Sequence, residues 1–68
     1  MKMMLVKIAP GRSIEVFYMN KENCDNYNQF HGYRETDYNY VREGYYYESM
    51  IGSFTSKDAA VEHARNNL

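Results

Sequence analysis

The sequence has few residues of the kinds that stabilise small domains covalently. Its 68 residues include one cysteine, Cys24, which excludes a disulfide within the chain. A structural zinc site usually takes four cysteine or histidine ligands, and this chain offers Cys24, His31 and His63. A domain of this size buries only about 60% of its unfolded surface. We therefore expect no metal or cofactor. We expect the chain to form a homodimer, in which a second copy supplements the core.

A long hydrophobic run is also absent. The apolar residues 1–8 are followed by Pro10 and Gly11, whereas a membrane span needs about 20 apolar residues and a secretory signal needs a cleavage site. We expect no membrane association. A single unpaired cysteine favours the reducing cytoplasm as the compartment.

Neither sign of charge dominates. Eight basic residues stand against nine acidic ones, for a formal charge of −1, whereas proteins that bind duplex DNA usually carry a basic excess. The four glycines are isolated, so no glycine-rich phosphate-binding loop is indicated.

Catalytic groupings are scarce. Cys24 and His31, with a nearby aspartate, could form a thiol catalytic set, but this would need a lowered thiol pKa and a surrounding pocket. A half-buried cysteine beside a surface histidine explains the same residues. Paired carboxylates would need a cleft, which a chain this short rarely encloses. We predict that the protein is not an enzyme.

Alternation of apolar and polar residues predicts an N-terminal β-hairpin. Residues 2–9 and 13–19 alternate, and residues 10–12 carry the proline and glycine of a turn. Lys7 and Glu15 would pair across the two strands. This hairpin is the first half of the expected sheet.

Further alternation and a capping signal complete the expected fold. Residues 38–43 and 45–52 would be two more strands, and Thr55 with Asp58 predicts the start of a C-terminal helix. Residues 54–60 resemble the strand-to-helix junction of many small ββα and βββα domains. The expected fold class is therefore α+β: one domain over residues 1–68, with a small antiparallel sheet of about four short strands and one C-terminal helix packed on a face.

The segment from 20 to 37 leaves two structures open. It is polar and rich in asparagine, so it is either a long loop or a short helix. The helix would be capped by Asn20 or Asn23 and would end at Gly32. Its spacing would put one cysteine, one tyrosine and one histidine on the same face: Cys24, Tyr27 and His31.

Tyrosine is present in excess. A chain of this length cannot bury all eight of its tyrosines, because each hydroxyl would need a buried partner. Some must lie at the surface, where tyrosine is typical of recognition faces. Strand alternation would gather four of them into one aromatic platform across a hairpin: Tyr38, Tyr40, Tyr45 and Tyr47.

We predict that this tyrosine-rich surface binds another protein. We expect tyrosines to be the anchors, arginines to form a charged rim and asparagines to make adaptable hydrogen bonds. The anchors are Tyr38, Tyr40, Tyr45, Tyr46 and Tyr47. The rim is Arg34 and Arg42, and the asparagines are Asn26 and Asn28. One alternative is single-stranded RNA or DNA, with bases stacked on the rings and phosphates at the arginines. Another is a structural homo-oligomer that buries the tyrosines against a second copy.

The composition also bears on the origin of the chain. Phe, Tyr, Met, Ile, Asn and Lys, which have AT-rich codons, total 30 residues, while Gly, Ala, Arg and Pro total 13. This composition, in a small protein that starts with a strand, resembles in style many bacteriophage early proteins. The resemblance implies that the bound protein is a host protein or defence complex, which the chain would inhibit.

Overall fold

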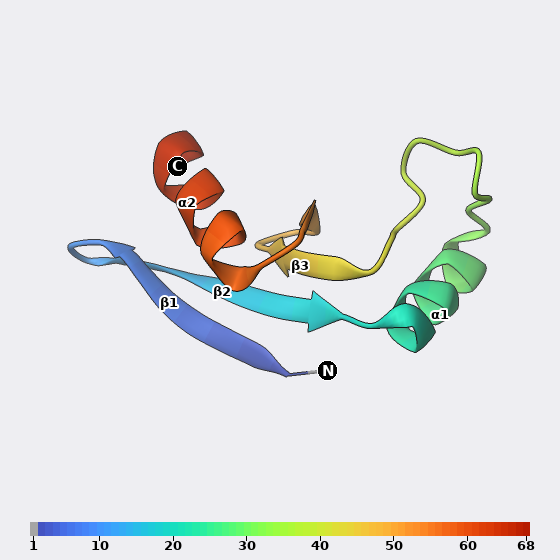
Figure 1. Cartoon of the computed structure of the whole chain (residues 1–68), viewed down its shortest axis with the longest axis horizontal. Helices are drawn as coiled ribbons and strands as arrows, with labels where there is room; N and C mark the ends of the chain where they lie inside the picture. The colour runs from blue at the N-terminus through green and yellow to red at the C-terminus, as the bar shows by residue number, and fades with distance from the viewer. Residues whose placement is uncertain (1) are drawn as a thin grey trace.

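The structure, a computed structural model, describes residues 2–68 and is a sheet with two helices (Figure 1). Within these residues the elements follow in the order β1 (Met3–Ala9), β2 (Arg12–Met19), α1 (Lys21–His31), β3 (Gly44–Tyr47), β4 (Ile51–Phe54) and α2 (Lys57–Asn67). The strands form one antiparallel sheet in the order β1-β2-β3-β4. The predicted α+β fold, with its N-terminal hairpin and C-terminal helix, is confirmed.

The β1–β2 hairpin forms where the alternation predicts it. Its turn contains Gly11, whose φ of 74° lies in the left-handed region that glycine adopts without strain. The register differs from the expected one, because Leu5 lies opposite Glu15 and Lys7 lies opposite Ser13. The predicted pairing of Lys7 directly across from Glu15 is therefore wrong by two residues.

The second half of the sheet is shorter than predicted. The expected strand at 38–43 is wrong, since these residues form a loop, and the expected strand at 45–52 is interrupted by a turn. Two residues of that turn, Glu48 and Met50, have φ of 53° and 66°, which reverses the chain. The result is the β3–β4 hairpin in place of one long strand.

One hydrophobic core lies between α2 and the sheet. The buried residues of β2 and β3 pack against small side chains of α2, and the alanines let the helix approach closely. The helix begins after Ser56, whose Oγ accepts a hydrogen bond from the Ala59 amide at 3.1 Å. The predicted cap at Thr55 is therefore wrong by one residue. The core residues are Ile14, Val16, Tyr47, Ala60, Val61 and Ala64.

A second core lies on the opposite face of the sheet. Adjacent residues of β2, Val16 and Phe17, are both buried, and adjacent strand residues point to opposite faces. Phe17 stacks on Tyr46 with ring centroids 6.1 Å apart. The buried residues of this core are Phe17, Met19, Cys24, Val41 and Tyr46, with Tyr27 and Met50 packed against them. Both faces of the sheet are therefore covered over part of its area.

Helix α1 supports this second core and confirms the helical alternative for the asparagine-rich segment. Asn20 caps it, with the side-chain oxygen accepting from the Asn23 amide at 2.8 Å. Gly32, with φ of 72°, ends it. The molecule is elongated, 39 × 22 × 18 Å, with α1 near one end and the turn of the β1–β2 hairpin at the other (Figure 1). No helix within residues 2–68 has the length and apolar character needed to cross a membrane.

Candidate functional site

The site is built on the end of α1, which terminates in a Schellman motif. The Gly32 amide donates to the Gln29 carbonyl at 3.2 Å, and the Tyr33 amide donates to the Asn28 carbonyl at 2.8 Å. These two bonds turn the chain back over the helix. They place Tyr33 beside Tyr27, which lies one and a half turns earlier, with ring centroids 6.3 Å apart.

Four aromatic side chains gather at this turn, and we call them the aromatic patch: Tyr27, Phe30, His31 and Tyr33. The His31 ring lies 4.3 Å from Tyr27 and stacks at 5.1 Å on Tyr33, with an interplanar angle of 12°. Phe30 meets His31 edge-on at 5.2 Å. Phe30 is nevertheless 85% exposed, so its large apolar surface contributes little to the core.

The 33–43 loop faces the patch and is held at one end by Asn28. This side chain is 3% exposed. Its amide nitrogen donates to the Val41 carbonyl and its oxygen accepts from the Val41 amide, each at 2.8 Å. One side chain thus satisfies both backbone groups of a buried loop residue, as a neighbouring strand would. This is the physical reason that residues 38–43 are ordered without being a strand.

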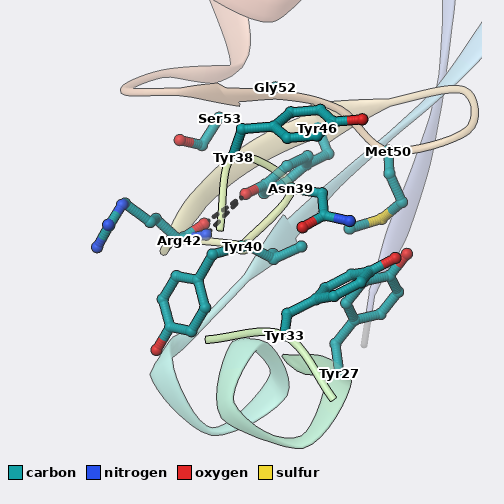
Figure 2. A pocket seen from close by; sticks show the side chains of 11 residues that line it. Tyr27, Tyr33, Tyr38, Asn39, Tyr40, Arg42, Tyr46, Met50, Gly52 and Ser53 are labelled. Atoms are coloured by element: carbon teal, nitrogen blue, oxygen red, sulfur yellow. Dashed lines mark hydrogen bonds between the residues drawn. The ribbon is translucent and has the colours of Figure 1, made fainter. Parts of the chain in front are cut away.

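A second buried side chain holds the loop one residue further on. The Tyr46 hydroxyl donates to the Arg42 carbonyl and accepts from the Arg42 amide at 3.2 Å, as the dashed lines in Figure 2 mark. Burial raises the pKa of Tyr46 above its ordinary value, so the phenol keeps its proton at neutral pH. Its hydroxyl can therefore serve as both donor and acceptor.

The middle of the loop is fixed by its own residues. The Asp37 carboxylate accepts from the Arg34 amide at 2.8 Å, and the Asp37 amide donates to the Arg34 carbonyl at 2.8 Å. The Arg34 guanidinium also lies 3.8 Å from the same carboxylate. With Asn28 and Tyr46 at the other end, this turn presents Tyr38 to solvent in a defined position, and Tyr38 is fully exposed.

The loop, α1 and the β3–β4 hairpin enclose a hollow of about 290 Å³. Figure 2 shows Tyr27 and Tyr33 on the α1 side of this hollow, with Tyr46 and Met50 across from them and Tyr40 on the flank. We call it the aromatic hollow. Five of its eleven lining residues are tyrosines, whose rings have apolar faces and whose hydroxyl groups can form hydrogen bonds.

A second hollow of about 310 Å³ lies on the other side of Tyr40 and is lined mainly by charged residues. Lys21 pairs with Asp25 at 2.8 Å there. The Arg42 guanidinium lies 5.1 Å from the centre of the Tyr40 ring, within the range of a cation–π contact. This side of the loop gives the aromatic hollow a charged rim.

Cys24 borders the charged hollow but is 3% exposed, with its thiol directed at the Met19 carbonyl, 3.7 Å away. Burial raises the pKa of the Cys24 thiol, whereas a nucleophilic cysteine needs a lowered pKa. Within residues 2–68, no three histidine, cysteine, aspartate or glutamate side chains are grouped as a metal site would require.

The structure divides the predicted contact residues into two groups. Tyr38, Tyr40, Arg34 and Arg42 all lie on the loop, and Asn26 is exposed on α1. Asn28, Tyr46 and Tyr47 are buried, at 3%, 4% and 1% exposure, because Asn28 and Tyr46 hold the loop and Tyr47 packs under α2. Their side chains are therefore not part of the exposed surface.

The predicted aromatic platform is also wrong in its geometry. Tyr45 and Tyr47 do share a face of β3, but Tyr38 and Tyr40 belong to the loop and not to a strand. Tyr45 is half-buried and meets Tyr18 at 5.0 Å. In its place the structure provides the aromatic patch and the aromatic hollow.

Sequence reasoning missed the patch as a site. Tyr27 and His31 were expected on one face of the possible helix, but Phe30 lies off that apolar stripe. A phenylalanine on the polar side of a short helix is the signal that could have located the patch, because such a side chain cannot reach the core.

No family model matches the chain, and neither the curated proteins nor the solved structures include a significant match to it.

Proposed function

We propose that this chain is a small, non-enzymatic protein-binding module that contacts its partner through the aromatic patch, the aromatic hollow and Tyr38. The observation that carries the proposal is the exposure of Phe30 and Tyr38, at 85% and 101%, on a surface whose backbone is fixed from beneath. Large exposed rings on an ordered surface are typical of interface anchors. Scattered apolar residues are common on any surface, but here four aromatic rings form one connected cluster, with Phe30 joined to it through His31.

The ordering of the loop favours tight binding. Asn28 and Tyr46 together make four hydrogen bonds to loop backbone groups. The loop therefore loses little conformational freedom when a partner docks, and less of the gross interaction free energy is spent on ordering it. Tyrosine anchors add large contact area at low side-chain entropy cost.

The local charge favours a protein partner over nucleic acid. Residues 20–43 contain three basic and five acidic residues, a net charge of −2 next to the patch. The Arg34 guanidinium lies against the Asp37 carboxylate, and Arg42 lies against Tyr40 and donates to the Glu35 carbonyl at 3.3 Å. A phosphate backbone would meet more negative than positive charge here. A partner with an apolar protrusion and hydrogen-bonding groups around it fits better.

The composition supports a more specific form of the proposal. If the AT-rich composition reflects a bacteriophage origin, the partner is a host protein or defence complex and the module acts as its stoichiometric inhibitor in the cytoplasm. Inhibition would follow from covering a surface that the host protein uses, without chemistry on the module's side.

The test is a quantitative capture experiment with tagged protein and a bacterial lysate, followed by affinity measurement on the captured protein. The variants are Phe30→Ala and Tyr38→Ala, and the control is Leu68→Ala, an exposed apolar residue just after α2. Interface anchors cost about 2 kcal/mol or more when truncated, or roughly a 30-fold rise in Kd. We expect that loss for at least one patch variant and no change for the control.

Nuclease treatment and added salt separate this function from the nucleic-acid alternative. Capture of a protein that survives both treatments and depends on Phe30 or Tyr38 supports the proposal. Recovery of nucleic acid that salt releases would overturn it in favour of base stacking, and so would protein capture that is indifferent to both substitutions, in favour of a different surface.

A further inference from the structure

The two edges of the sheet differ in how well they could accept another strand. Among the described residues, β1 and β4 each pair with one neighbour, and an edge strand leaves a row of backbone N–H and C=O groups without sheet partners. β4 has four residues, and its pairing with β3 shifts register. β1 has seven residues, and its pairing is regular from Met3 to Lys7. β1 is therefore the edge suited to strand addition.

The side chains of β1 are more apolar than an exposed edge normally is. On the face away from α2, Leu5 is 75% exposed and Met3 is 57% exposed. On the α2 face, three further residues are half-buried at the margin of the first core: Met4, Val6 and Ile8. Apolar surface is thus left incomplete on both faces of the same strand.

We propose that β1 pairs antiparallel with β1 of a second copy of this chain, around a two-fold axis at Leu5, to give one continuous eight-stranded sheet. A two-fold axis perpendicular to the sheet makes the contact self-complementary and closed, as in most homodimers. It also keeps both α2 helices on the same face, on either side of the junction. Met4 of one copy then lies opposite Val6 of the other, so the first core continues across the interface.

The charges on β1 agree with this register. With Leu5 on the axis, Leu5 lies opposite its own copy and Lys7 lies opposite Met3 of the second copy. The two Lys7 positions are about 14 Å apart along the strands, which exceeds the Debye length of about 8 Å at physiological ionic strength. No lysine directly opposes a lysine. Two copies of β1 can therefore pair through their apolar centres while their basic residues stay apart.

A second copy of the chain is the partner that fits the free edge of β1. In the Leu5-centred register, apolar side chains of β1 meet across the axis and no two lysines face each other, and the interface would extend a core that a chain of 68 residues leaves small. This inference does not rest on the proposed function, because Leu5 and the aromatic patch belong to different elements.

The first experiment is sedimentation equilibrium of the whole chain from low micromolar to near-millimolar concentration. We expect a mass of twice 8.1 kDa at the upper end. Leu5→Lys puts two like charges opposite each other at the axis and should raise the dimer dissociation constant by about tenfold or more. Since Leu5 is 75% exposed, the substitution does not disturb the monomer's core. A monomeric mass for the wild type at every concentration would overturn the proposal.

Phe30→Lys is the matched control, because it places the same charge on an exposed apolar residue of α1. It should leave the dimer mass unchanged while impairing partner capture, and Leu5→Lys should do the reverse. Equal weakening of the dimer by both substitutions would overturn the β1 interface. Loss of partner capture and loss of the dimer are separate readouts, so the β1 interface and the binding function can be rejected independently.

Disulfide crosslinking tests the register. Leu5→Cys brings two thiols to facing positions with Cα atoms about 4.5–5.5 Å apart, within the range that a disulfide spans. Lys7→Cys leaves its two thiols too far apart. The wild type, whose Cys24 is 3% exposed, is the background control. We expect covalent dimer from Leu5→Cys under mild oxidation, and preferential crosslinking of Lys7→Cys would overturn the Leu5-centred pairing.

Discussion

The two cores of this protein lie on opposite faces of one sheet and are completed by different kinds of contact. Under α2, aliphatic side chains and small alanines pack around Tyr47, and apolar contact holds the helix to the sheet. Beside α1, the core is smaller, and two polar side chains, Asn28 and Tyr46, hold a loop that no strand accompanies. Two aromatic rings at this end, Phe30 and Tyr38, are exposed to solvent.

This difference separates the residues that stabilise the fold from those of the proposed binding surface. The hydrophobic effect does not depend on the orientation of the groups that are buried, and it holds α2 against the sheet. Hydrogen bonds from buried side chains are directional, so they can hold a loop in one conformation while leaving its outer surface free. Substitutions in the first core should therefore act on the whole fold, whereas those in the second should act first on the loop.

The largest expected effect is that of Tyr47→Ala. Tyr47 is 1% exposed, and its hydroxyl shares a hydrogen bond of 2.7 Å with Nδ1 of His63 on α2. Truncating a buried aromatic residue costs about 3–5 kcal/mol, a large fraction of the stability of a domain this size. Urea denaturation followed by circular dichroism should show this loss. Tyr38→Ala, at a fully exposed ring, should stay within about 0.5 kcal/mol of the wild type, and equal losses would contradict the division between the two regions.

An intermediate effect is expected from Asn28→Ala. The substitution leaves the amide and carbonyl of Val41 without partners, which costs about 1–3 kcal/mol. Hydrogen exchange should detect it first at the Val41 amide and the 33–43 loop, while amides of β2 and α2 stay protected. Asn26→Ala, on the exposed side of the same helix, is the control. Loss of protection throughout the sheet would show that the two regions unfold as one unit.

The smallest effect, and one that depends on pH, is expected from Tyr46→Phe. At neutral pH, loss of the hydroxyl should lower the free energy of unfolding by about 1 kcal/mol. The cost is small because Arg42 is exposed, so water can hydrogen-bond to its backbone in place of the hydroxyl. Burial raises the pKa of Tyr46 in the folded chain, so its contribution is present below the unfolded pKa of about 10 and is lost as pH rises through the folded pKa. The stability difference between wild type and variant should shrink above pH ~10. A difference that grows with pH would contradict the assignment.

The parts of the fold that were predictable from sequence depend on local signals. The Pro10–Gly11 turn, the Asn20 cap and the Gly32 helix end each act within a few residues of chain, and alternation identified β1 and β2. The 38–43 loop could not be predicted, because the Asn28–Val41 hydrogen bonds join residues 13 apart. Tyr38 and Tyr40 alternate as in a strand, but this segment is held by hydrogen bonds from the Asn28 side chain and not by a neighbouring strand.

The candidate site was predictable in part for a related reason. The excess of tyrosine predicted that some rings lie at the surface, and Tyr38 is fully exposed, although neither Tyr38 nor Tyr40 lies on a strand. Tyr46 and Tyr47 were misassigned because β3 is covered on both faces. Adjacent residues of β3 are both buried, so alternation no longer distinguishes inside from outside.

The strand order β1-β2-β3-β4 has a consequence for how quickly the chain folds after synthesis. Each strand pairs with its neighbour in sequence, and residues 20–43 are the one long insertion, between β2 and β3. Chains whose contacts are mostly local fold fastest, because little loop entropy is lost before contacts form. Both hairpins can form as soon as they are made, and closure of the insertion between them completes the sheet and the proposed binding surface in the same step.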